Sequence, residues 1–125
     1  MLQSIFGYRR PAPGFQPQTR TAIKQMSVAE LYSQMEAGQT PLLVDVRSPE
    51  EYEWDGHIEG SRLLPLQMLM QRADELPKDQ PIVVVCRSGN RSQVACEQLA
   101  AAGFENLANL AGGMMDWKRH GYPSK

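Results

Sequence analysis

The chain has 125 residues, 42% of them hydrophobic, and a formal net charge of −1 at pH 7. This length fits one domain with its own core, and the balanced charge gives no reason to expect a nucleic-acid or membrane partner. Two cysteines and two histidines indicate neither a disulfide framework nor a metal cluster. Because no membrane-length apolar run or secretory signal is present, we expect a cytoplasmic protein that needs no cofactor.

The first 22 residues differ in composition from the rest of the chain. Three prolines and two glycines between positions 7 and 17 break regular structure, and no acidic residue precedes Glu30. We expect a flexible arm over residues 1–22; the alternative is a strap packed on the domain through Phe6, Tyr8 and Phe15. The domain is expected over residues 23–122, followed by a tail at 123–125.

Beyond this arm, apolar runs alternate with segments rich in helix formers. Strands are expected at residues 23–26, 42–46, 61–64, 82–85 and 107–110, each followed by a helical segment. The alternation predicts an α/β fold in which a central, mostly parallel sheet of about five strands has helices on both faces.

Capping residues mark several helix ends. Ser27 and Glu30 have the spacing of a capping box, in which each residue satisfies the backbone N–H of the other. Ser48 followed by Pro49 is a second strong helix start, and Gly103 is placed to end the helix before it.

The most informative stretch follows the fourth predicted strand. That strand ends at Cys86, and a loop with Arg87, Gly89 and Arg91 leads to a helix that we expect to open at Ser92. Ligands of α/β sheets bind at such strand ends, where free N–H groups and the helix dipole favour negative charge. A positive setting lowers the pKa of a thiol and favours the nucleophilic thiolate. The alternative, a small buried cysteine, is less consistent with this loop.

Four other residues have two interpretations each. Cys96, on the helix after the loop, is either a small buried residue, which we favour, or a resolving thiol. Asp45, Arg47 and His57 are either acid–base groups or structural residues that satisfy loop backbone or one another. Because a thiolate ionised by its own loop needs no histidine base, we leave these three outside the catalytic set.

Four motifs in the same order resemble those of single-domain rhodaneses, which are sulfurtransferases. The motifs are D-V-R followed by E-Y at residues 45–52, G-H-I-x-G at 56–60, C-x-x-G-x-R-S at 86–92, and L-x-G-G-x-x-x-W at 110–117. The resemblance covers about residues 23–122 and implies an α/β sandwich around a parallel sheet.

The resemblance implies that Cys86 is the nucleophile. It would take the sulfane sulfur of an anionic donor such as thiosulfate, hold it as a persulfide and pass it to cyanide or a thiol. The substrate- and persulfide-binding loop would consist of Arg87, Ser88, Gly89, Asn90, Arg91 and Ser92. Its N–H groups would face the sulfur, with Arg87 at the mouth and Arg91 either bracing the loop or holding the donor's oxyanion end.

The length of this loop separates the family from its relatives. Cys86 and Arg91 enclose four residues, whereas the phosphatases of similar fold enclose five, and Arg87 favours an inorganic donor over mercaptopyruvate. Two alternatives stay open besides the small-donor enzyme. One is a persulfide carrier in a protein sulfur relay, and the other is a non-catalytic binding module, which the intact loop argues against.

Overall fold

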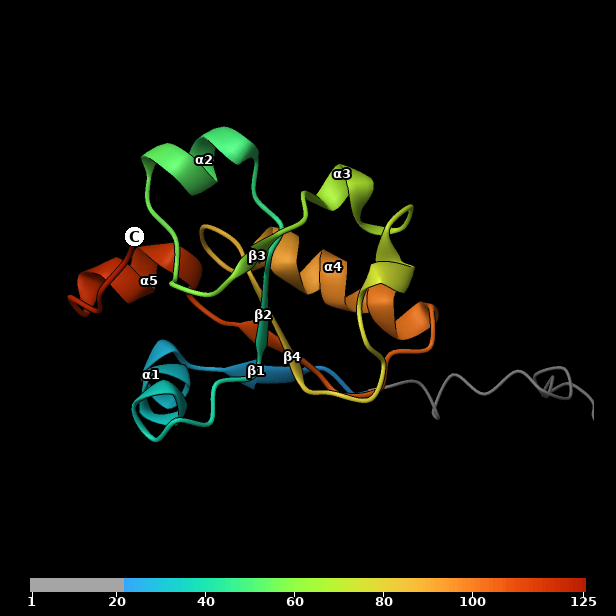
Figure 1. The fold of residues 1–125 in the computed structure, drawn as a ribbon, viewed down its shortest axis with the longest axis horizontal. Coiled ribbons are helices and arrows are strands. Elements are labelled where there is room, and N and C mark those ends of the chain that lie inside the picture. The colour runs from blue at the N-terminus through green and yellow to red at the C-terminus, as the bar shows by residue number, and fades with distance from the viewer. Residues whose placement is uncertain (1–21) are drawn as a thin grey trace, which may run out of the picture.

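The computed structural model describes residues 22–125, and the expectation of an N-terminal arm falls almost entirely outside them. Within this range, five strands form one sheet: β1 (Lys24–Met26), β2 (Leu42–Asp45), β3 (Arg62–Leu63), β4 (Ile82–Val85) and β5 (Leu107–Leu110). Their order is β1-β5-β4-β2-β3, and every neighbouring pair is parallel (Figure 1). The predicted α/β class and the five-stranded sheet are confirmed.

Helices cover both faces of the sheet, as the alternation predicts. They are α1 (Val28–Glu36), α2 (Pro49–Trp54), α3 (Leu66–Leu69), α4 (Asn90–Ala101) and α5 (Gly113–Arg119), with a short 3₁₀ turn, η2 (Ala73–Glu75). Buried residues of α3, η2 and α4 form one core cluster with the sheet, and those of α1 and α5 form the other. In Figure 1 these two groups of helices lie on opposite sides of the central strands.

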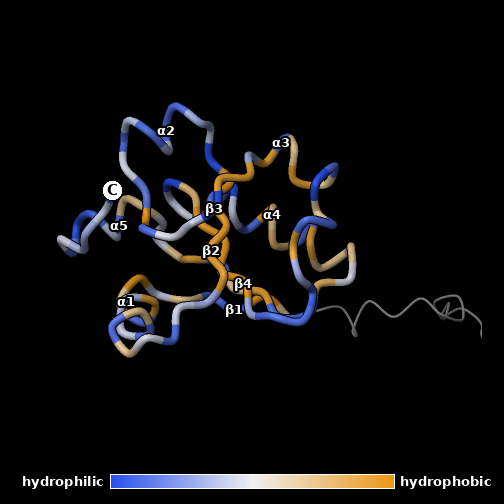
Figure 2. The backbone as a smooth tube through the Cα atoms, in the orientation of Figure 1, coloured by the Kyte–Doolittle hydropathy of each residue, from blue (hydrophilic) through white to orange (hydrophobic). Residues whose placement is uncertain are grey.

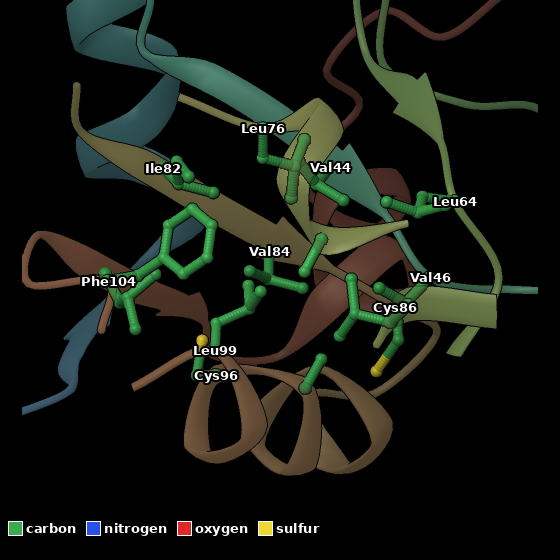
Figure 3. Close-up of a cluster of buried hydrophobic side chains, with 14 residues drawn as sticks. Val44, Val46, Leu64, Leu76, Ile82, Val84, Cys86, Cys96, Leu99 and Phe104 are labelled. Atoms are coloured by element: carbon green, nitrogen blue, oxygen red, sulfur yellow. The ribbon is translucent and has the colours of Figure 1, made fainter. Parts of the chain in front are cut away.

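The central strand β4 contributes to both clusters. Ile82, Val84 and Cys86 face α3 and α4 (Figure 3), while Val83 and Val85 face α1 and α5. Successive side chains of a strand point to opposite faces, so a strand buried on both faces reads as a continuous apolar run. Figure 2 shows the hydrophobic residues concentrated along these central strands.

One of the two predicted helix starts differs in detail. The Ser27 hydroxyl accepts from the Glu30 N–H at 3.0 Å, but the Glu30 carboxylate pairs with Lys24 instead of returning to the cap. The complete capping box lies at α2, where Ser48 and Glu51 satisfy each other's backbone N–H groups. An oppositely charged neighbour on β1 thus removes half of the box expected at α1.

The start of α4 corrects the expectation that Ser92 opens this helix. The helix begins two residues earlier, at Asn90, after Gly89 at φ +102°. Glycine adopts this left-handed conformation without the steric penalty of a side chain, so the chain turns into the helix without a side-chain cap. Ser92 is therefore the third helical residue, and its side chain is buried.

The described residues also limit the kinds of site in this part of the chain. Between residues 22 and 125, no helix is long and apolar enough to cross a membrane. Within the same range, no group of three or more metal-ligating side chains is close enough together to hold an ion. Residues 123–125 pack on the domain, because Trp117 Nε1 donates to the Pro123 carbonyl and Lys125 pairs with the backbone of His57.

Candidate active site

Cys86 lies directly after β4, at the carboxyl end of the sheet, where α2 and the beginning of α5 also lie (Figure 1). Its side chain is 1% exposed, and its sulfur points toward α4 (Figure 3). The strand places the thiol here because residues 82, 84 and 86 share one face of the sheet. The thiol is thus held at the base of its loop.

Hydrogen-bond donors surround the Cys86 sulfur. The Gly89 N–H donates to Sγ at 3.1 Å, and the Ser92 hydroxyl lies 3.3 Å from it. Burial raises the pKa of the Cys86 thiol, but the Ser92 hydroxyl and the N–H groups of Ser92, Gly89 and Ser88 outweigh it. The pKa therefore lies below its ordinary value, and the loop favours a thiolate.

The first turn of α5 holds the outer side of the same loop. The N–H groups of Met114 and Met115 donate to the carbonyls of Cys86 and Arg87, both at 2.9 Å. A Cβ on Gly113 would stand 2.5 Å from the Cys86 oxygen and 2.6 Å from the Arg87 oxygen. Glycine at this position thus permits the close approach that turns loop carbonyls outward and leaves N–H groups facing the sulfur.

Arg91 is paired with a carboxylate on α2. Its Nη1 and Nη2 donate to the two Glu51 carboxylate oxygens at 2.7 and 2.8 Å. This bond lowers the pKa of Glu51 to about 2, against the opposing effect of burial, and raises the pKa of Arg91. Of the two roles considered for Arg91, the geometry therefore fits the brace.

The three residues left outside the catalytic set have structural contacts. Arg47 and Asp45 form a buried ion pair at 2.9 Å, and Arg47 also donates to the Gly56 carbonyl at 2.8 Å. The His57 ring stacks on Tyr52 at 3.6 Å and bonds through Nδ1 to the Tyr52 carbonyl. These contacts are those expected of the structural interpretation of all three.

Cys96 is the second thiol, and its setting differs from that of Cys86. It is fully buried in the same core cluster, on α4, and is not in a disulfide. Burial, followed by the charges of Glu97 and Cys86, raises its pKa to about 12. A thiol that stays protonated is a poor nucleophile, so Cys96 behaves as a small apolar residue.

A small pocket of about 170 Å³ borders the loop at Arg87. Its lining residues come from the loop, the segment after β2, the end of α2, and α5: Arg47, Asp55, Arg87, Met114, Met115 and Lys118. We call it the mouth pocket. A larger hollow, of about 550 Å³, lies at the amino ends of β2, β4 and β5, which is the opposite end of the sheet from Cys86. The mouth pocket is therefore the one relevant to the thiol.

Sequence reasoning missed two parts of this site. One is Asn109 on β5, whose side chain meets Ser92 and Gly89; a polar residue inside an otherwise apolar run was the available signal. The other is the mouth pocket, because nothing in the local sequence around Asp55 and Lys118 indicates that they meet beside Arg87. The remaining loop residues, Ser88 and Asn90, are exposed.

Residues 27–120 match the family model of the rhodanese-like domain. The chain therefore belongs to the rhodanese-like domain family. It is similar to a sulfurtransferase of Allochromatium vinosum, with 44% identity over 82 residues, 66% of this chain and 76% of that protein. It also resembles the adenylyltransferase and sulfurtransferase uba4 of Ogataea parapolymorpha, with 39% identity over 69% of this chain but only 22% of that protein.

A solved structure shares the fold. The rhodanese-related protein of Thermoplasma volcanium superposes with a TM-score of 0.74 and 32% identity, and the match covers 82% of this chain and 97% of that one. The resemblance drawn from four sequence motifs is thus confirmed at the level of family and fold.

Proposed function

We propose that the chain is a sulfurtransferase in which Cys86 takes a sulfane sulfur from an anionic donor and passes it on through a persulfide. The observation that carries the proposal is the set of donors around Sγ, namely the Gly89 N–H and the Ser92 hydroxyl, together with backbone N–H groups that lower the Cys86 pKa. Such donors stabilise a sulfur anion before and after the transfer. Membership of the family and the name of the Allochromatium relative support the same chemistry.

The reaction divides into two displacements at sulfur. With thiosulfate as the donor, the Cys86 thiolate attacks the outer sulfur, a new S–S bond forms, and sulfite leaves with the electron pair of the old bond. A cyanide ion or a thiolate then attacks the outer sulfur of the persulfide. Cys86 leaves as the thiolate, and the product is thiocyanate or a new persulfide. No net oxidant or reductant is needed, and the loop carries one negative charge throughout.

The narrow approach to the thiol supports sulfur over a bulkier group. Cys86 is 1% exposed, only four residues separate it from Arg91, and α5 holds the carbonyls of Cys86 and Arg87 at the beginning of this loop. A single terminal sulfur atom of a donor is small enough to reach Cys86 Sγ through this narrow opening. A phosphate would need several donors around three oxygens, and the Arg91 guanidinium is already paired with Glu51.

A second candidate is a persulfide carrier that transfers sulfur to another protein. Two exposed apolar side chains near the mouth pocket favour it: Trp54, 84% exposed beside Asp55, and Met115, 39% exposed. Exposed aromatic and methionine side chains are typical of protein-binding surfaces. The Ogataea relative carries both an adenylyltransferase and a sulfurtransferase name, and this chain spans about a fifth of its length.

Mass spectrometry of the intact chain tests the proposal. After incubation with thiosulfate, we expect a gain of one sulfur atom that cyanide removes, absent in Cys86→Ala and present in Cys96→Ala. No gain with a reactive Cys86 would exclude thiosulfate as a donor, and a gain from a persulfidated protein would then support the carrier. No gain from either donor would contradict sulfur transfer.

A further inference from the structure

The Ser92 hydroxyl has two neighbours that compete for one proton. Its oxygen lies 2.5 Å from Asn109 Oδ1 and 3.3 Å from Cys86 Sγ. A serine hydroxyl donates a single hydrogen bond. It therefore cannot satisfy the amide oxygen and a sulfur anion at the same time.

The orientation of the Asn109 amide follows from its other contacts. Its Nδ2 donates to the Gly89 carbonyl at 3.1 Å and to Gln25 Oε1 at 2.9 Å. A flipped amide would place two acceptor oxygens against each other at Gly89, since a backbone carbonyl can only accept. Oδ1 therefore faces Ser92, and the hydroxyl must donate to it at that short distance.

Asn109 occupies a position that the fold would otherwise fill with an apolar side chain. It is 3% exposed, and on β5 it follows Leu107 on the face that packs against α4. Burying an amide costs free energy unless its groups are paired. Its amide pairs with the two residues that adjoin Sγ, with Gly89 through the backbone carbonyl and with Ser92 through the hydroxyl.

We propose that Asn109 is a positioning residue that accepts the hydrogen bond of the Ser92 hydroxyl while Cys86 is a neutral thiol, and that the hydroxyl turns to Sγ only when the sulfur is ionised. In the thiol state, the S–H can donate to Ser92 Oγ, and Ser92 donates onward to Asn109. In the anionic state, Ser92 turns, and the oxygens of Ser92 and Asn109 must separate. By competing for the Ser92 hydroxyl, Asn109 limits how strongly that hydroxyl stabilises the Cys86 thiolate. The thiolate is therefore more nucleophilic than it would be without the Asn109 oxygen.

The inference concerns Cys86 as the nucleophile of the proposed function, but its test requires no sulfur transfer. All variants carry Cys96→Ala, so that Cys86 is the sole thiol of the chain. The ionisation of Cys86 is followed by the ultraviolet absorbance of its thiolate as a function of pH. The rate of alkylation by iodoacetamide then reports the nucleophilicity of that thiolate.

Asn109→Leu has nearly the same shape and removes the competing oxygen. We expect its titration midpoint to move to lower pH, with the thiolate-to-thiol ratio at a fixed pH rising about two- to tenfold, the effect of one hydrogen bond. At high pH, where both chains are ionised, it should react more slowly by about the square root of that factor. The plots of alkylation rate against pH for the two chains should therefore cross. A variant that merely loosened the structure around Cys86 is not expected to react faster at low pH and more slowly at high pH.

The Ser92→Ala background shows whether the effect passes through the hydroxyl. There, Asn109→Leu should leave the midpoint unchanged. The charged groups near Cys86 are the same in all these chains: Arg87 beside it, Arg91 paired with Glu51 on the α4 and α2 side, and the buried Asp45–Arg47 pair on the β2 side.

The loss of the Asn109 amide still leaves the Gly89 carbonyl a partner, because the Gln93 N–H donates to it at 3.3 Å. Asn109→Ala provides a second variant without the oxygen if the leucine variant does not fold. Gln98→Leu makes the same amide-to-apolar change on α4, away from the loop, and serves as the control. An unchanged or raised midpoint, or an equal shift in the Ser92→Ala background, would overturn the proposal.

Discussion

Arg91 and Glu51, forty residues apart in the chain, form a two-pronged ion pair with N–O distances of 2.7 and 2.8 Å. The same Glu51 carboxylate accepts the Ser48 N–H and closes the capping box of α2. The Glu51 side chain therefore caps the start of α2 and also binds the first turn of α4, which directly follows the Cys86 loop. Such paired bonds are stronger and more directional than a single ionic contact.

This pair should make stability depend on pH in the acid range. The folded-state pKa of Glu51 is about 2, below its ordinary value of 4.5. A lowered acid pKa adds stability that is fully present above 4.5 and is lost as pH falls toward 2. Because Arg91 is 40% exposed, solvent screening limits the gain to about 1 kcal/mol. We expect Glu51→Gln to lose this amount at pH 7 and only a small part of it at pH 2, where about half of the Glu51 carboxyls are protonated in the folded state, as measured by urea unfolding.

A second arginine–carboxylate pair provides the control. Arg72 and Glu75 also make two bonds, at 2.8 and 2.9 Å, but on the exposed surface. Glu75→Gln should therefore change the unfolding free energy far less than Glu51→Gln does. Equal effects of the two substitutions would show that the Glu51 pair has no special structural role.

Gly113 allows α5 to touch the active loop. Gly113→Ala would place a Cβ within 2.6 Å of the Cys86 and Arg87 oxygens, so the loop or the helix must move. We expect a loss on the order of 100-fold in the rate of sulfur uptake by Cys86, as for other displaced reacting groups. Mass spectrometry over a time course after addition of thiosulfate measures this rate.

Gly121→Ala is the matched control for backbone strain. Gly121 also has a positive φ, +73°, but nothing lies within 4 Å of its added Cβ. Both variants pay about 1–2 kcal/mol for the left-handed conformation, and only Gly113→Ala disturbs the loop. If both slow sulfur uptake alike, the contact with Cys86 is not the reason.

Much of the fold could be predicted because it follows from local patterns. The apolar run predicts β4, and Gly103 predicts the end of α4, each from residues close in sequence. The predicted bounds of these two elements agree with the structure to within a residue or two. The position of Cys86 at the end of β4 follows from the same run. Four motifs were enough to identify the family, and the motif at residues 86–92 contains Gly89 and Ser92, which contact the sulfur, but no motif indicated Asn109 behind them.

The contacts that shape the site could not be predicted, because they join distant segments. Arg91 could face an anion or a carboxylate, and only the placement of Glu51 on α2 decides between them. Ser92 is expected from the sequence to open its helix, whereas the helix begins earlier, after Gly89 at positive φ, and the Ser92 hydroxyl bonds to Asn109 on β5. In each case the partner is set by the order of strands in the sheet.

The two thiols should differ strongly in reactivity. The pKa of Cys86 is lowered by its donors, while burial raises that of Cys96 to about 12. At pH 8 we expect a limiting amount of iodoacetamide to label Cys86 alone, as located by peptide mass spectrometry. Cys96→Ala should retain both labelling and sulfur uptake. Labelling of Cys96 before Cys86 would contradict this assignment of roles.

The mouth pocket should recognise the charge of the donor. Arg87 and Lys118 outnumber Asp55 among its exposed charged side chains, so an anion is attracted to the side of the loop. We expect Arg87→Ala and Lys118→Gln each to raise the KM for thiosulfate about two- to fivefold, the range for exposed charge pairs. The effect should weaken as ionic strength rises, because salt screens exposed charges.

Arg119 supplies the control for this last prediction, because it lies next to Lys118 on α5 but outside the mouth pocket, where it pairs with Asp116. Arg119→Gln changes the net charge of the chain as Lys118→Gln does, so any long-range effect of net charge is common to both. Alkylation of Cys86 by the uncharged iodoacetamide should be alike in these two variants. If Arg119→Gln raises the KM for thiosulfate as much as Lys118→Gln does, the pocket does not bind the donor. If Arg87→Ala slows alkylation as much as it weakens thiosulfate use, Arg87 acts on the thiolate and not on the donor.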